Sequence, residues 1–148
     1  MTRAAPFDLD RFVTAQAAVF PAVLAELKAG RKRTHWVWFV FPQLCGLGHS
    51  SMATFYGIAS LHEARAYLGH PLLEPRLDLC TRIVLELEAG SLHEIFGSPD
   101  DMKVQSSMTL VAVAAAEPTS VFYRALDRWC GGTLDPQTRT LLEAGGPR

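Results

Sequence analysis

The placement of prolines, glycines and capping residues between apolar segments predicts a chain of helices. Asp8 or Asp10 can open a first helix near the N-terminus. Pro21 is tolerated at the border between this helix and a second one, which we expect to run to about Lys28. Gly30 follows as a stop signal, because glycine adopts the left-handed conformation that often ends a helix.

The four-residue sequence SLHE occurs at residues 60–63 and again at residues 91–94. Each copy matches a capping box, in which the serine hydroxyl accepts a backbone N–H and the glutamate reaches back to the cap. The first copy predicts a helix that Gly69 ends. A longer helix follows from about Pro71, and we expect Gly90 to close it.

A helix with strong start signals follows Gly97. Ser98 is expected as its cap, Pro99 stands in its first position, and Asp100 and Asp101 lie in its first turn, where negative charge opposes the helix dipole. Pro118 ends it. Its later half, residues 110–116, is apolar on every side, which predicts that other elements enclose it.

Two further helices complete the chain. We expect Thr119 to cap the first, which Gly131 stops, and Asp135 with Pro136 to open the last one. Alternating strand-like segments are almost absent. The sequence therefore predicts a mainly α, multihelical fold of about seven helices with little or no sheet. We expect a single domain over residues 1–148, with its core at about 7–144.

Residues 34–41, THWVWFVF, are the one ambiguous segment. A strand and a helix both point His35 and Gln43 broadly the same way, but roughly 26 Å apart as a strand and 12 Å apart as a helix. Only the helical form lets both reach one small ligand. The segment is either the central core element or the wall of a polar-lined apolar pocket, since Trp36 and Trp38 need hydrogen-bond partners when buried.

Two further features are candidate ligand-binding elements. The turn with Gly46 and Gly48 precedes a helix that Ser50 or Ser51 caps, and backbone N–H groups at such an entry can cradle an anion. On the helix from Pro99, three polar residues fall within about 60° of one another and in line with the apolar stripe: Asp100, Lys103 and Ser107. They form either an ion pair at the rim or part of a ligand site.

Composition and charge narrow the possible partners. Of the 148 residues, 49% are hydrophobic and 20% charged, which is a globular balance. A net charge of −1 and one short basic cluster at residues 31–33, interpreted as a solvated turn, predict neither nucleic acid nor membrane as partner. The widely spaced Cys45, Cys80 and Cys130 predict reduced thiols, no metal site and a cytoplasmic protein without a cofactor.

Three segments make the chain similar to a known family. They are THWVWFVFPQLCGLGHSSMATFYGI (residues 34–58), EARAYLGHPLLEPRL (residues 63–77) and FGSPDDMKVQSSMTL (residues 96–110). In this order, across residues 7 to about 138, they resemble the uncharacterised family called domain of unknown function 1810. The resemblance implies a mainly α-helical fold of bacterial and plant proteins and no established chemistry. Its pattern falls on His35, Trp36, Trp38, Phe39, Pro42, Gln43, Gly46, Gly48, Tyr56, Pro71, Arg76, Phe96, Gly97, Asp100, Lys103, Ser107, Met108 and Thr109.

The main functional hypothesis is a small-ligand-binding domain, either an enzyme or a non-catalytic binder, for a nucleotide-like molecule. A distant likeness to small proteins that process ADP-ribose derivatives adds ADP-ribose-like molecules to this class. One of the two tryptophans of the aromatic run would stack on a base, and His35 and Gln43 would form hydrogen bonds with it. Lys103 and the turn of Gly46 and Gly48 would hold a phosphate.

The alternative hypothesis is a non-catalytic protein–protein interaction module. In that case the aromatic run would lie partly exposed, as a contiguous apolar patch, with no enclosed pocket beside it.

Overall fold

The computed structural model describes residues 7–145, and these fold into a mainly helical structure, as predicted. The described residues contain ten helices rather than about seven, because three of them have only four to six residues. The helices are α1 (Asp10–Ala17), α2 (Phe20–Lys28), α3 (Val37–Val40), α4 (Ser51–Tyr56), α5 (Leu61–Leu68), α6 (Leu73–Glu86), α7 (Leu92–Phe96), α8 (Asp100–Ala115), α9 (Val121–Cys130) and α10 (Pro136–Gly145).

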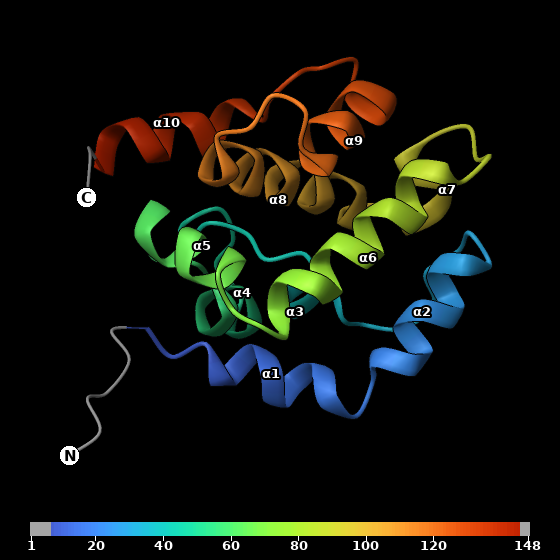
Figure 1. Cartoon of the computed structure of the whole chain (residues 1–148), viewed down its shortest axis with the longest axis horizontal. Coiled ribbons are helices and arrows are strands. Elements are labelled where there is room, and N and C mark those ends of the chain that lie inside the picture. Colours follow the sequence, from blue (N-terminus) through green and yellow to red (C-terminus); the bar gives the residue numbers. More distant parts are fainter. Residues whose placement is uncertain (1–6, 146–148) are drawn as a thin grey trace.

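The long helix α8 lies at the centre of the arrangement (Figure 1). It packs against α5 and α9 along its length and also contacts α3, α7 and α10. In Figure 1, α9 and α10 lie on one side of the molecule and α1 and α2 on the other, with α6 crossing between them. Leu110, Val111 and Ala112 are fully buried, so the middle of the apolar half of α8 is enclosed as predicted, but its end is not, since Ala116 is exposed.

The aromatic run is not a strand. Its residues 37–40 form the single helical turn of α3, while Trp36 and Phe41 flank it in non-helical conformations. Among residues 7–145, β-type pairing is limited to an isolated bridge between Leu44 and Ile58, next to this turn. None of the helices in the same residue range is long and apolar enough to cross a membrane.

Several predicted caps are confirmed by hydrogen bonds. The hydroxyls of Ser50, Ser60 and Ser91 accept the N–H of the third residue of their helices, and Asp135 does the same for Thr138. In the first capping box the glutamate reaches one residue further back, since Glu63 accepts the N–H of Ala59 at 2.7 Å.

Three predicted helix ends are wrong. Ser98 does not cap α8, because Pro99 stands at the cap position rather than in the first helical position, and no side chain makes a capping hydrogen bond there. The cap of α9 is Ser120 and not Thr119, since the Ser120 hydroxyl accepts the N–H of Tyr123. Helix α6 stops at Glu86, four residues before Gly90.

The early end of α6 has a tertiary cause. The Trp129 indole donates to the carbonyl of Val84 at 3.1 Å, and Arg128 donates to that of Leu87 at 3.0 Å. Both donors belong to α9. They satisfy carbonyls at the end of α6, so the chain leaves the helix without a glycine.

Hydrogen bonds to Glu26 of α2 hold the segment that leads into the aromatic run in place. Its carboxylate accepts the N–H groups of Arg33 and Thr34 at 2.7 and 3.0 Å, and the Thr34 hydroxyl at 2.6 Å. The Trp36 indole adds a fourth bond at 2.9 Å. The residue is only 9% exposed. Burial alone would raise the pKa of Glu26, but the hydrogen bonds outweigh it and lower the pKa to about 2.

These contacts predict a specific loss of stability in acid. The folded pKa of Glu26 lies below its ordinary value of 4.5, so its contribution is fully present above about pH 4.5 and is lost as the pH falls toward 2. We expect Glu26→Gln to lower the free energy of unfolding at pH 7 by about 3 kcal/mol. In urea titrations, this difference should shrink between pH 4.5 and pH 2.5.

The matched control for this prediction is Glu88→Gln, which changes an exposed carboxylate. Its unfolding midpoint should follow that of the natural protein at each pH. A Glu26→Gln deficit that stays constant down to pH 2.5 would show that the carboxylate charge does not stabilise the fold.

Candidate functional site

The aromatic run and the amino end of α8 meet in the fold. Helix α3 contacts α8, and the Lys103 ammonium lies 4.8 Å from the centre of the Trp38 ring. This is a cation–π distance. Asp100 and Ser107 lie on the same face of α8 as Lys103, because they are three and four residues away from it.

A lysine outside the predicted set completes the charges of this site. The Lys32 ammonium lies 2.7 Å from one oxygen of Asp100, and the Lys103 ammonium lies 3.4 Å from the other. The Lys32 side chain is 6% exposed. The interpretation of residues 31–33 as a solvated turn is therefore wrong for Lys32, whose side chain is buried, and right for Arg31 and Arg33, which are exposed. No local signal predicts this, since its partner is 68 positions away.

The site holds more positive charge and more donors than its own residues use. Two ammonium groups share the single carboxylate of Asp100. Two buried polar atoms, Trp38 Nε1 and Ser107 Oγ, have no hydrogen-bond partner among the described residues. Such groups are rare because burial without a partner costs about 1–3 kcal/mol.

Ser107 differs from its neighbours on α8 in this respect. The hydroxyls of Ser106 and Thr109 donate to carbonyls one turn earlier, at 3.0 and 2.9 Å. Ser107 is 0% exposed and makes no such bond. Its hydroxyl is therefore free to bond with a group from outside the helix.

Trp36 and Tyr56 serve the core. Trp36 is 1% exposed, donates its N–H to Glu26 and packs against Phe41 and Phe96. The Tyr56 ring packs on Phe12, Phe39 and Phe55. With Trp36 enclosed, the run does not form the contiguous exposed patch that the interaction-module hypothesis predicts.

The remaining predicted residues lie apart from the Trp38–Lys103 pair or make no contact that links them to it. His35 is exposed and Gln43 half-buried, and neither side chain makes a hydrogen bond to a described residue. Gly46 faces Leu141 of α10. It lines a separate cavity of about 370 Å³ together with Leu47 and residues at the start of α10.

The three free thiols differ in exposure, since Cys45 is exposed, Cys80 buried and Cys130 half-buried. Burial raises the pKa of Cys80 to about 12 and that of Cys130 to about 11, so both thiols are protonated and weakly nucleophilic at neutral pH. In the described part of the chain, no three His, Cys, Asp or Glu side chains are grouped to hold a metal ion.

Comparison with known proteins identifies the family. The profile described as "Protein of unknown function (DUF1810)" matches residues 6–142. The chain belongs to the DUF1810 family. Among solved structures, this DUF1810 protein is similar to the conserved hypothetical protein Rv1873 from Mycobacterium tuberculosis, with 55% sequence identity and a TM-score of 0.91. The match covers 94% of this chain and 99% of that one. No curated protein matches significantly.

The shared carboxylate predicts unequal roles for the two lysines of this DUF1810 protein. Lys103→Met leaves the 2.7 Å pair of Lys32 with Asp100 intact, so we expect a loss of at most about 1 kcal/mol in unfolding free energy. Lys32→Met leaves Asp100 with only the longer pair, and we expect a loss of about 2 kcal/mol or more.

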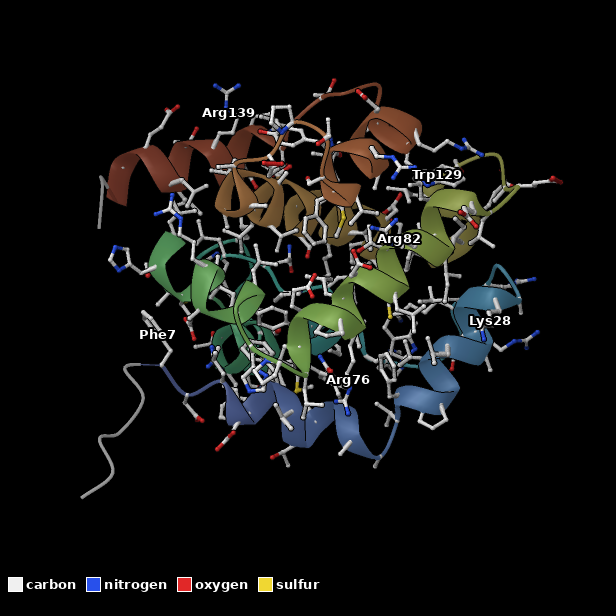
Figure 2. All side chains as sticks on the ribbon, viewed as in Figure 1. Phe7, Lys28, Arg76, Arg82, Trp129 and Arg139 are labelled. Carbon is white, nitrogen blue, oxygen red and sulfur yellow. The ribbon has the colours of Figure 1, made fainter. Side chains whose placement is uncertain are left out.

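Urea unfolding of both variants at pH 7 measures this difference. Lys28→Met is the control, because Lys28 is an exposed residue at the end of α2 (Figure 2). It should leave the midpoint unchanged. If Lys32→Met and Lys103→Met lose the same unfolding free energy, Lys32 is not the main partner of Asp100.

Proposed function

We propose that this protein is a small-ligand-binding domain whose ligand places an anionic group beside Trp38, Lys103 and Ser107. The observation that carries the proposal is the pair of buried donors without partners next to a surplus ammonium group. An oxyanion can accept hydrogen bonds from both donors and neutralise the surplus charge. No group of the described chain supplies these acceptors.

The Lys103 side chain lies over the Trp38 ring and is free to move. It is 24% exposed, and its ammonium covers the ring while it makes only a 3.4 Å contact with Asp100. Because Lys32 holds Asp100 more closely, Lys103 can move toward a ligand at little cost. Its movement would uncover the face of the ring.

A nucleotide-like ligand fits this combination best. A phosphate group presents several acceptor oxygens to the ammonium, the indole N–H and the hydroxyl, and a lysine binds phosphate well as a point charge. The Trp38 ring, once uncovered, offers an apolar face for a base or a ribose. ADP-ribose, NAD and AMP contain these parts, so they are the first ligands to test.

Ser107→Ala tests the proposal without damaging the fold. Removal of an unpartnered buried hydroxyl is neutral or stabilising, so we expect an unchanged or slightly higher Tm without ligand. Affinity for the binding nucleotide should fall about tenfold or more, because a hydrogen bond to a charged group is lost. Ligand affinity is measured by calorimetry and by Trp38-dependent fluorescence, with ADP-ribose, NAD, AMP and pyrophosphate, and with adenosine as the uncharged control.

Ser106→Ala is the matched control, since its hydroxyl bonds to a carbonyl within α8. It should leave affinity unchanged. The proposal fails if no phosphate-bearing compound binds, if adenosine binds as well as AMP, or if the two alanine variants behave alike.

A further inference from the structure

A cleft lies at the carboxyl end of α8, at the opposite end of the helix from Asp100 and Lys103. It has a volume of about 440 Å³ and lies between α5, α6, α8 and α9. Leu68, Ala114, Ala115 and Phe122 supply apolar walls. Arg65 and Glu74 supply one charge of each sign. Ala114 is 14 residues beyond Asp100, about 21 Å along the helix axis, so this cleft is independent of the proposed site.

The half-buried carboxylate of Glu74 has no charged or hydrogen-bonding partner among the described residues, since its oxygens make no ion pair and accept no hydrogen bond there. Burial raises the pKa of Glu74, and the nearby Asp78 raises it further. Arg82 offsets this only in part, because its guanidinium is paired with Asp78 at 2.8 Å. The charge of Glu74 therefore costs stability in the free protein.

The carboxyl end of α8 adds negative potential to the same cleft. Helix α8 ends at Ala115, where Ala116 turns the chain in a left-handed conformation (φ 56°). The last carbonyls of such a helix have no following turn to bond with and carry a partial negative charge. Helix α5 also ends at the cleft, but the N–H groups of Gly69 and His70 bond to its last carbonyls. The end of α8 therefore favours a cation close to Glu74.

Arg65 supplies the opposite charge. It belongs to the last turn of α5, is exposed, and makes no ion pair with Glu74 although both line the cleft. A guanidinium is suited to a carboxylate, which it can bind through two parallel hydrogen bonds. The cleft thus presents an acceptor for a cation, a donor for an anion, and aliphatic and aromatic surface.

We propose that this cleft binds a zwitterionic α-amino acid with an aliphatic side chain. The ammonium group lies against Glu74 and the carboxyl end of α8, and the carboxylate pairs with Arg65. The side chain packs on Leu68, Ala114, Ala115 and Phe122. The volume lies within the range of small-molecule sites.

Calorimetry on the full chain at pH 7 tests this with three related probes. L-Leucine has both charges, L-leucinamide lacks the carboxylate, and 4-methylpentanoate lacks the ammonium group. We expect leucine to bind with a Kd in the millimolar range or below, and each single-charge probe to bind at least tenfold more weakly. Absence of leucine binding up to 20 mM, or equal binding of the three probes, overturns the proposal.

Two variants assign the charges. Glu74→Gln should weaken leucine binding at least tenfold, and leucinamide should bind this variant no more tightly than leucine does. Arg65→Gln should weaken the binding of leucine but not that of leucinamide. Tm without ligand should be unchanged or higher for Glu74→Gln, which separates a binding role from a folding role. Natural affinity in both variants contradicts the proposal. Ser107→Ala should bind leucine normally, so failure of this site and failure of the nucleotide site are distinguishable.

Discussion

The rest of the structure depends on the buried carboxylate of Glu26. A carboxylate in a protein interior is stable only when its oxygens receive enough hydrogen bonds to replace water. Two backbone N–H groups, a hydroxyl and an indole N–H provide them, all from residues 33–36. These bonds fix the path of the chain after α2. Lys32 is then directed toward Asp100, and Trp36 enters the core.

The central helix α8 has different electrostatic surroundings at its two ends. At the amino end, two ammonium groups share one carboxylate beside unpartnered donors. At the carboxyl end, the carboxylate of Glu74 has no partner among the described residues and lies in a cleft beside the end of α8. Buried donors without partners and a half-buried unpaired carboxylate each cost stability in the free protein.

Local signals in the sequence predicted most of the helices but not all of their ends. Three caps were predictable: Ser60, Ser91 and Asp135. In each, the side chain accepts the N–H three residues later, and this bond depends on the local backbone and not on the tertiary surroundings. The end of α6 was mispredicted because Arg128 and Trp129, from α9, satisfy its last carbonyls. The sequence does not decide whether the residues of α3 form a strand or a helix, since four residues are too few to show a periodicity.

The sequence by itself determined that Asp100, Lys103 and Ser107 share one face of a helix, because helical spacing is a property of the local backbone. Tertiary structure alone decided their surroundings. It brought Lys32 and Trp38 to that face, enclosed Trp36 and placed Tyr56 and Gly46 in other contacts. Pairing between residues tens of positions apart follows from how helices pack, and packing depends on the whole core rather than on any short segment.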